Sequence, residues 1–523
     1  MSDGEQPWKP RANPWLVAII VTLGAFMEVL DTTIVNVSLP HIAGSLSISA
    51  DESTWTLTTY LVANGIVLTI SGALSRRLGR KNYFLICIGA FTAASLACGI
   101  STNFEEILLF RALQGFFGGG LQPTQQAIIL DHFPPEKRQQ AFSLTAIAII
   151  IAPVAGPVVG GYLTDTYSWH WIFLINIPIG IGTFFGVMQF VEDSPMIRRE
   201  KETAPRFDYL GVLFIAIALG CLEVGVDRGE DYDWLGSGFI RTMFVLSACG
   251  FVFGITYLLY ARDPIVNLRV FRDHNFALGS LQIALMGFVL YASAVLIPQF
   301  AQQQLGYTAT WAGLVLAPGA VVLTLLIPVA GRLMNVVPTK YIIATGGLAL
   351  AVALYYSMNL VPDLDFYHLM LFRAAQTAAL ALLFVPISTI AYATIPRELN
   401  GDATALFSMA RNVFGGIGIS VSTALVTEHL QVRQSFVVEH LSPVSQPYNV
   451  LLQQTQQALM DAGQSMAQAV QGAPGQVLQM VQGQVAVLAY NDVFLITAAM
   501  SLAMIPTALL MSGIRTKSSG GGH

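Results

Sequence analysis

Fourteen apolar windows, each about as long as a membrane-spanning helix, run through the chain. About 20 apolar residues in helical form cross roughly 30 Å of hydrocarbon. A backbone in lipid must satisfy its own hydrogen bonds, which leaves only helices or closed barrels, and windows this long are helical. We therefore predict an all-α polytopic membrane protein with 14 transmembrane helices. The windows are 15–36, 55–75, 83–101, 106–128, 140–163, 171–190, 208–226, 240–260, 275–299, 311–331, 340–358, 367–391, 404–426 and 491–512.

Composition supports lipid as the main solvent and excludes several classes of function. Only 11% of the 523 residues are charged, against about 25% in soluble domains. The net charge is −5 and the chain has no basic tract, so we expect no nucleic-acid partner. The four cysteines lie inside apolar windows, which favours packing roles over a disulfide or a metal site. We expect no metal and no cofactor.

The distribution of Lys and Arg predicts the topology. If the N-terminus is cytoplasmic, 20 of the 26 basic residues fall on the cytoplasmic side, three on the opposite side and three within the windows. Cytoplasmic loops are enriched in Lys and Arg. We therefore expect both termini in the cytoplasm and an even number of spans. The first window has no cleavage site and is predicted to be a retained span.

Two short patterns recur at a spacing of 262 residues and indicate duplicated halves. FRALQ at 110–114 returns as FRAAQ at 372–376, and Pro134-x-Glu136 returns as Pro396-x-Glu398. Transporters are often built from such repeats. The predicted organisation is a cytoplasmic segment 1–14, a six-helix half 15–190, a linker 191–262 with two extra helices, a second six-helix half 263–512 and a cytoplasmic tail 513–523.

The one large hydrophilic segment, 427–490, is predicted to be external and holds fourteen glutamines but a single Arg, Arg433. Its apolar spacing predicts amphipathic helices at 450–470 and 476–488, broken at Gly472-Ala473-Pro474-Gly475. Two interpretations stay open. The segment is either a disordered polar loop, or a helical hairpin that docks on a partner or caps the external mouth.

Charged residues inside the windows are the main candidates for function, because a charge in hydrocarbon must be paired or must face a cavity. Glu28 and Asp31 lie three residues apart on one helical face. Two carboxylates in a medium of low dielectric repel, so such a pair is suited to exchanging a proton. The alternative is that Glu28 merely faces a water-filled vestibule.

Three arginines within the windows and one further acid complete this set. Arg111, followed by Gln114 and Gly115, can hold a carboxylate and respond when that acid is protonated; the alternative is a fixed ion pair that locks helices together. Its repeat partner Arg373 lacks the glycine run, which favours a structural role. Glu223 and Arg411 are candidates for the substrate cavity or for packing.

The fifth window carries Ala152-x3-Gly156-Pro157-x2-Gly160-Gly161. A kink-forming proline beside glycines that allow close helix approach could serve as a rocking interface. Small-residue patterns are common in spans, so the signal is weak by itself.

Together these motifs resemble the major facilitator superfamily, and specifically its fourteen-span drug:proton antiporter branch. Residues 30–40 (LDTTIVNVSLP), with Asn36 as a further cavity candidate, resemble the first-span motif, and Arg111-x2-Gln114-Gly115 resembles the proton-coupling motif. Residues 72–81 (GALSRRLGRK), with Gly72, Arg76, Gly79 and Arg80, resemble the cytoplasmic loop motif. The fifth-window pattern resembles the antiporter motif, which implies export. The segments WHWIFLINIPIG (169–180), DRG (227–229) and YTATWAG (307–313) are similar to EmrB-type transporters.

The resemblance implies a multi-pass protein of the bacterial inner membrane that uses a proton gradient and works with a periplasmic EmrA-type adaptor and a TolC-type outer-membrane channel. Substrates and protons would share the central cavity, with Asp31, Glu28 and Arg111 in proton coupling and Asp31, Asn36, Gln114, Glu223 and Arg411 as cavity candidates. Two departures stand out. Arg76 replaces an acidic residue of the loop motif, so no charge lock is implied there, and His170 replaces a common Arg.

The sequence therefore predicts a proton-driven exporter of hydrophobic or amphipathic toxic compounds that alternates access between its halves. Within transport, the alternative is a dedicated exporter of one physiological solute, such as a fatty acid or siderophore. Outside transport, the alternatives are a membrane enzyme or a non-transporting sensor. The sequence lacks a Gly-x4-Gly-Lys-[Ser/Thr] loop, a His-Glu-x2-His pair and a Gly-x-Ser-x-Gly elbow, which disfavours ATP-driven pumping and common hydrolytic chemistry.

Overall fold

The computed structural model describes residues 11–195, 197, 207–361, 364–440 and 446–512, and every regular element in these ranges is helical. The all-α prediction is confirmed. The α-helices are α1 (Pro14–Ile34), α2 (Leu39–Leu46), α3 (Ala50–Leu78), α4 (Arg80–Gly99), α5 (Phe104–Gly118), α6 (Leu121–His132), α7 (Pro135–Thr166), α8 (Trp171–Leu174), α9 (Asn176–Phe190), α11 (Tyr209–Asp227), α12 (Gly238–Tyr260), α13 (His274–Gln303), α14 (Ala309–Leu314), α15 (Ala317–Val336), α16 (Thr339–Tyr356), α17 (Phe366–Ala381), α18 (Phe384–Tyr392), α19 (Asn400–His440), α20 (Gln446–Asp461), α21 (Met466–Leu502) and α22 (Met504–Leu510).

Helix occupies all fourteen predicted windows, although several windows hold two helices in succession. Within the described ranges, twelve helices are long and apolar enough to span a membrane, and the bent helix α7 brings the number to 13. The remaining window, 106–128, holds α5 and α6, which are separated by Gly119 and Gly120 and are each too short alone. The structure is thus compatible with fourteen spans, and that number stays a prediction.

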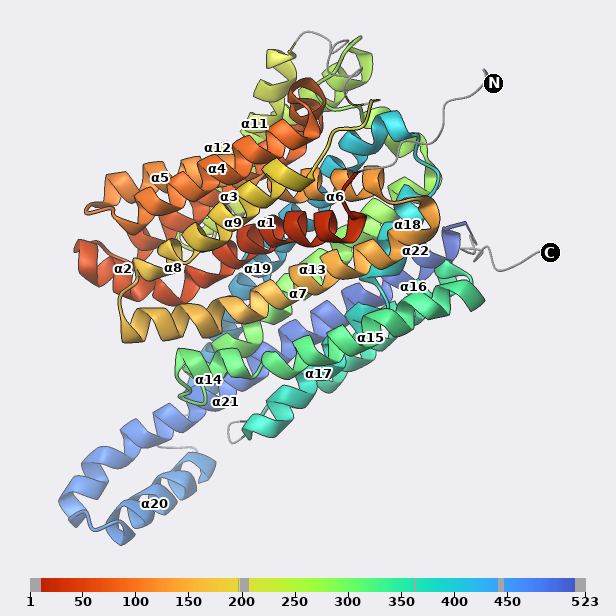
Figure 1. Ribbon diagram of the computed structural model, residues 1–523. Coiled ribbons are helices and arrows are strands. Elements are labelled where there is room, and N and C mark those ends of the chain that lie inside the picture. Colours follow the sequence, from red (N-terminus) through yellow and green to blue (C-terminus); the bar gives the residue numbers. More distant parts are fainter. Residues whose placement is uncertain (1–10, 196, 198–206, 362–363, 441–445, 513–523) are drawn as a thin grey trace.

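The long helices lie side by side, and α20 with the first part of α21 projects beyond one end of the bundle (Figure 1). We call the opposite end the basic end, because Arg76 lies there at the end of α3. The first and last described helices both reach it: the Trp15 ring lies 5.1 Å from that of Phe133, and the Ser512 backbone N–H donates to Asn275 at 3.0 Å. This agrees with an even number of spans. The predicted tail 513–523 and most of segment 1–14 lie outside the described residues.

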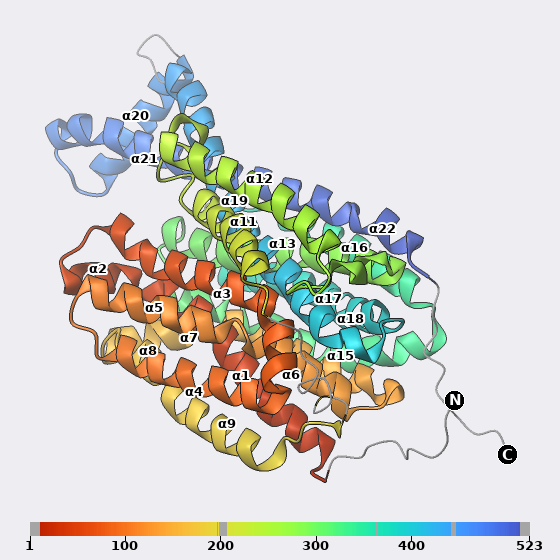
Figure 2. The ribbon, with the colours of Figure 1, turned by 90° about the horizontal axis from the view of Figure 1, so that it is seen from above.

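Helices α11 and α12, predicted as an insertion, pack together along one side of the bundle (Figure 2). Helix α11 also packs against α3 and α19, which belong to different predicted halves. Asp208 caps α11 by accepting from the Gly211 N–H and also accepts from the Tyr257 hydroxyl, each at 2.8 Å. The inserted pair is therefore fixed against the seam between the halves. Part of the predicted linker, 198–206, lies outside the described residues.

Within the segment 427–490, α20 and the first part of α21 form a helical hairpin, but the predicted break at 472–475 is wrong. Helix α20 ends before Gly463, which has a φ of +93°, and the Gln464 N–H donates to the Leu459 carbonyl at 3.1 Å. Ser465 and Gln468 then form a capping box that starts α21. Helix α21 continues through Pro474 into the last span. Pro474 is exposed, so water can solvate the carbonyl that loses its partner.

Candidate functional site

Asp31 lies at the centre of a buried polar network formed by four helices of the N-terminal half. Its carboxylate accepts from Arg111 Nη1 at 2.5 Å, from Gln114 Nε2 at 2.8 Å and from Asn176 Nδ2 at 2.9 Å. Gln114 Nε2 also donates to Ser95 Oγ at 2.7 Å. Asp31, Arg111 and Gln114 are each 0% exposed. The carboxylate is therefore balanced by one guanidinium and held by donors from α5 and α9, and Ser95 of α4 holds Gln114 in turn.

Arg111 is fixed in turn by helix α3. Its Nε donates to the Thr56 carbonyl at 3.0 Å, and its guanidinium carbon lies 4.2 Å from the centre of the Tyr60 ring. Gly115 makes this approach possible, because a Cβ at that position would overlap the Tyr60 carbonyl oxygen. The spacing Arg111-x2-Gln114-Gly115 thus has a direct structural reason: two residues of α5 bind Asp31 and the third lets α3 close over them.

Glu28, one helical turn before Asp31 on α1, belongs to a different network. Its carboxylate accepts from Asn64 Nδ2 at 2.9 Å and from Gln122 Nε2, and Gln122 Oε1 accepts from Arg411 Nη2. Arg411 lies on α19, so this chain of hydrogen bonds joins the two predicted halves. The two acids share a helix, as predicted, but each has its own partners.

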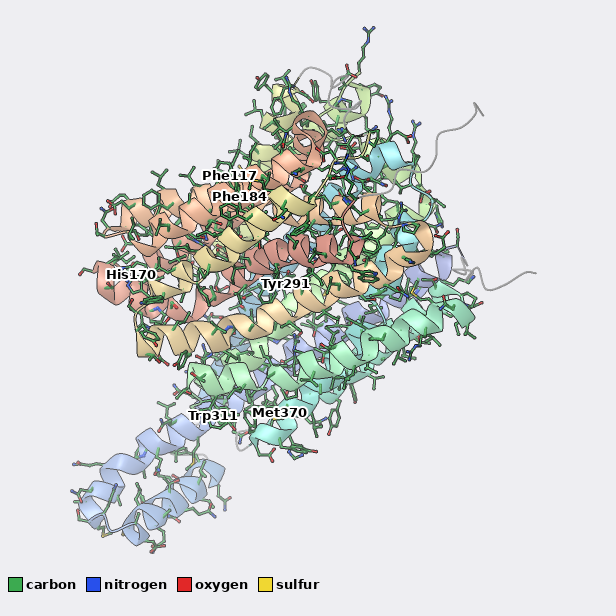
Figure 3. The ribbon with its side chains drawn as sticks, viewed as in Figure 1. Phe117, His170, Phe184, Tyr291, Trp311 and Met370 are labelled. Carbon is green, nitrogen blue, oxygen red and sulfur yellow. The ribbon has the colours of Figure 1, made fainter. Side chains whose placement is uncertain are left out.

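A cavity of about 140 Å³ lies between the halves and is lined by Glu28 and not by Asp31. Tyr291, which lies in the middle of the bundle (Figure 3), lines the cavity from the C-terminal half. Of the predicted cavity residues, Asn36 is in the lining. Asp31, Gln114, Glu223 and Arg411 are not in the lining.

The inserted helix α11 contributes an acid to this cavity whose role there was not predicted from the sequence, although it belongs to the DRG motif. Asp227 is in the lining and accepts from the Thr58 hydroxyl. Glu223, one turn earlier, lies against α19: a Cβ at Gly416, itself in the lining, would be 2.8 Å from Glu223 Oε1. The insertion is thus part of the cavity wall.

Arg373 repeats part of the arrangement of Arg111, with a serine in place of the carboxylate. Its Nη1 donates to Ser293 Oγ at 2.8 Å and to Gln376 at 3.3 Å, and Gln376 Nε2 donates to Ser357 Oγ at 2.9 Å. Each of these residues stands 262 positions after its counterpart in the first network, and Ser293 stands 262 positions after Asp31. Within the described residues, Arg373 has no carboxylate partner.

The basic end of the bundle is closed by contacts between the halves. Arg76 Nη1 lies 2.6 Å from Asp402 Oδ2, and a Cβ at Gly72 would lie 2.6 Å from the Gly401 carbonyl oxygen. A charge lock therefore does exist at Arg76, which the resemblance did not imply: the basic residue is on α3 and its acidic partner is on α19. The neighbouring loop is tied within its own half, because Arg80 pairs with Asp131.

Glycines of the cytoplasmic loop motif and of the antiporter motif have local structural roles. Gly79, with a φ of +86°, joins α3 to α4 in a conformation that favours glycine. Gly156 and Gly160 of α7 face α1, where a Cβ at Gly160 would lie 2.7 Å from the Ile34 carbonyl oxygen. Pro157 lines the cavity, and Gly161 is buried. This pattern therefore packs α7 on the helix that carries Glu28 and Asp31.

His170 lies in the turn before α8, at the end of the bundle opposite the basic end (Figure 3). Its ring stacks on Trp169 with the ring centres 3.7 Å apart, and burial lowers the pKa of the imidazole. His170 is therefore neutral at pH 7.

Comparisons with known proteins agree on one family. Residues 21–419 match the family model described as Major Facilitator Superfamily. The chain is 33% identical over 503 residues to the multidrug export protein EmrB of Escherichia coli, with 96% of each chain covered. It is 32% identical over 519 residues to the fatty acid resistance protein FarB of Neisseria gonorrhoeae, with 99% of each covered.

Solved structures show the same fold at low identity. The human organic anion transporter MFSD10 (TETRAN) aligns with a TM-score of 0.57 and 13% identity, covering 94% of this chain and 100% of that chain. A bacterial homolog of the human lysosomal transporter Spinster, inward-facing and unoccupied, aligns with a TM-score of 0.52 and 18% identity, covering 99% and 100%.

Proposed function

We propose a cargo, an energy source and partners for this chain, which belongs to the major facilitator superfamily and, within it, to the EmrB-type transporters. It is a multi-pass protein of the bacterial inner membrane and a transporter, not an enzyme. Our proposal is that it exports hydrophobic or amphipathic toxic compounds in exchange for protons, by alternating access between its two halves.

The separation of the two acids on α1 is the observation that carries this proposal. Asp31 is balanced by Arg111 in a closed network, whereas Glu28 lies in the cavity wall and is joined through Gln122 to the opposite half. A proton on Asp31 would remove the charge that balances Arg111 and loosen the hold of α5 and α9 on α1. Because Glu28 is one turn away on the same helix, that change would reach the cavity.

The charge of the cavity wall favours cationic or neutral cargo. Glu28 and Asp227 are in the lining, and no Lys or Arg of the described residues is. An acidic wall attracts cations and repels a free carboxylate. The cavity volume of about 140 Å³ is below the roughly 300–1,000 Å³ of sites for drug-sized ligands, so the halves would part further to admit cargo.

A dedicated exporter of a fatty acid is the second candidate, supported by the similarity to FarB. Arg411, directly behind the lining, has an Nη1 without a hydrogen-bond partner and could hold a carboxylate after Gln122 moves. A susceptibility panel in a pump-deleted host separates the two. Protection against several unrelated compounds supports broad export, whereas protection against one class of acid supports the dedicated exporter.

The proposed partners are an EmrA-type adaptor and a TolC-type channel, with the α20–α21 hairpin as the docking element. The hairpin projects from the end opposite the basic end (Figure 1) and exposes Val450, Met466, Val470 and Met480. Exposed apolar side chains on a helical hairpin suit packing against another helical protein. Because Lys and Arg favour the cytoplasmic side, our proposal places the basic end in the cytoplasm and the hairpin in the periplasm.

Deleting residues 436–486 tests the docking role with little effect on the spans. At the base of the hairpin, Arg433 donates twice to Asp492, with Nε–Oδ2 and Nη2–Oδ1 distances of 2.9 Å, and both residues would be retained. We expect the deletion to abolish co-purification with the adaptor while the protein still inserts. Undiminished complex formation would count against the docking role.

Proton coupling is tested with the purified protein in proteoliposomes and a panel of substrates. Substrate added on one side should drive proton release in the opposite direction, at a rate that saturates with substrate. A protein that shows no counterflow of any substrate under any proton gradient would instead favour the non-transporting sensor.

A further inference from the structure

A second cavity, of about 380 Å³, opens on the side of the bundle where the inserted helices pack against the two halves. Its walls come from α11, α12, the short helix Leu268–Arg272, α3 and α19, and we call it the seam groove. Among its lining residues only Thr69 carries a polar side-chain group, and that hydroxyl already donates to the Gly65 carbonyl at 2.9 Å. The walls therefore offer packing contacts and no free hydrogen-bonding group.

The basic end of the seam groove carries positive charge. Leu268 and Phe271 are in the lining, and the next residue after each is an exposed arginine, Arg269 and Arg272. Neither guanidinium forms an ion pair with another described residue. A lipid-facing apolar groove with free arginines at its membrane-surface end matches an acyl chain joined to an anionic headgroup.

The seam groove also borders the contacts that close the basic end. Thr69 on α3 is three residues before Gly72, which packs against Gly401, and Leu406 on α19 is four residues after Asp402, which pairs with Arg76. Parting of α3 and α19 at this end would pull two walls of the groove away from each other. A molecule bound across both walls interacts more strongly with the closed arrangement and shifts the population toward it.

We propose that the seam groove binds an acyl chain of an anionic phospholipid whose headgroup pairs with Arg269 and Arg272, and that this lipid favours closure of the basic end. The site is separate from the central cavity and does not depend on which compounds are exported. Its occupant comes from the bilayer, because the walls are apolar and the groove opens sideways, beside the lipid-exposed face of α12.

Photocrosslinking of the full-length protein in nanodiscs tests occupancy. The probes are phosphatidylglycerol and phosphatidylcholine with the same diazirine-bearing acyl chain, and labelled peptides are mapped. Ile255→Trp fills the groove from a lining position, and Val252→Trp is its control, since Val252 is exposed on the same helix but outside the lining. We expect phosphatidylglycerol labelling of α11 and α12 that Ile255→Trp abolishes and Val252→Trp preserves. Labelling that survives Ile255→Trp would overturn the site.

Charge variants test the headgroup. The double variant Arg269→Gln/Arg272→Gln should weaken phosphatidylglycerol labelling about 10- to 30-fold, as expected for the loss of two basic residues near an anionic lipid. Arg332→Gln removes an exposed arginine elsewhere and should have no effect. Equal labelling by the two lipids would refute headgroup pairing. Displacement of the probe by palmitate, with no preference for phosphatidylglycerol, would refute the phospholipid and identify a free fatty acid as the occupant.

A single-cysteine reporter tests the effect on closure. Ser75 is 2% exposed near the Arg76–Asp402 pair, so Ser75→Cys in a background without native cysteines reports opening of the basic end to a soluble maleimide. We expect slower labelling in nanodiscs that contain phosphatidylglycerol, and no lipid dependence when Ile255→Trp is added. Lipid-independent labelling of Ser75→Cys alone would refute the effect on closure.

Discussion

Asp31→Asn removes the charge that balances Arg111 and changes little else in shape. The native carboxylate accepts three hydrogen bonds of 2.5–2.9 Å, from Arg111, Gln114 and Asn176. Asparagine has only one side-chain oxygen. If that oxygen keeps the hydrogen bond from Arg111, the asparagine NH2 group faces the NH2 groups of Gln114 and Asn176, and donors then face donors. Breaking a fully buried ion pair from one side costs about 3–5 kcal/mol. The fold should tolerate this loss, because Arg373 is held in the second half by neutral acceptors alone.

The consequence for transport follows from the energy of a proton gradient. One proton moving down about 2 pH units releases about 2.7 kcal/mol, which sustains roughly a 100-fold substrate gradient. In proteoliposomes with an imposed pH gradient, the native protein should accumulate substrate toward that ratio. Asp31→Asn should bring the ratio to about 1, while substrate-for-substrate exchange continues because the cavity lining is unchanged.

Two further variants make this prediction decisive. Ser293→Ala alters the counterpart of Asp31 and should leave proton-driven accumulation intact. Glu28→Gln alters the cavity wall and should change substrate affinity before it changes coupling. Full proton-driven accumulation by Asp31→Asn, at native protein levels, would refute the assignment of Asp31. Loss of coupling in Glu28→Gln alone would transfer that role to Glu28.

Three other outcomes follow from local geometry. Arg76→Gln leaves buried Asp402 unpaired and should shift the equilibrium toward an open basic end by about 1–3 kcal/mol. This shift is smaller than the cost of breaking a fully buried ion pair. An unchanged maleimide labelling rate of a nearby cysteine would contradict this prediction. Gly115→Ala should lower the free energy of unfolding by about 1–3 kcal/mol through overpacking against α3, measured as a lower midpoint of thermal unfolding. Gly182→Ala is the control and should leave that midpoint unchanged, because a Cβ at Gly182 meets open space. Pro474→Ala should stabilise the hairpin by up to about 3 kcal/mol, measured as slower amide exchange around residue 474, and equal exchange would show that the proline carries no strain.

The helical bundle was predictable because hydropathy acts locally. An apolar window of about 20 residues has few alternatives to a spanning helix, and all fourteen windows are helical. The hairpin break was mispredicted because Gly472 and Pro474 are strong helix-breaking signals by composition. The break formed instead at Gly463, where the left-handed backbone and the Ser465 capping box act together. Sequence reasoning weighed the residues singly and missed that combination.

The site was predictable in its charges but not in its partners. Glu28, Asp31, Arg111 and Arg411 stand out because charges are rare in apolar windows. Several of their hydrogen-bond partners, such as Asn64, Gln122 and Asn176, are amides on other helices, and a neutral amide inside a span gives little warning of its role. Asp227 was named only within the DRG motif and given no role in the cavity, because it lies just beyond the seventh apolar window (208–226); α11 packs at the seam and carries this acid into the cavity lining.

The internal repeat explains why one half holds the candidate proton site. The sequence repeat identified Arg111 and Gln114 as counterparts of Arg373 and Gln376, and the structure extends the match to Ser95 and Ser357. It fails at the acceptor that faces Nη1, where Asp31 in the first half corresponds to Ser293 in the second, and at Nε, which donates to the Thr56 carbonyl in Arg111 but has no hydrogen-bond partner among the described residues in Arg373. A serine cannot give up or take a proton at physiological pH, so the second arginine keeps its neutral acceptors throughout a cycle. Two halves with one inherited framework therefore differ in the single group that can titrate, and proton coupling through this framework would be confined to α1.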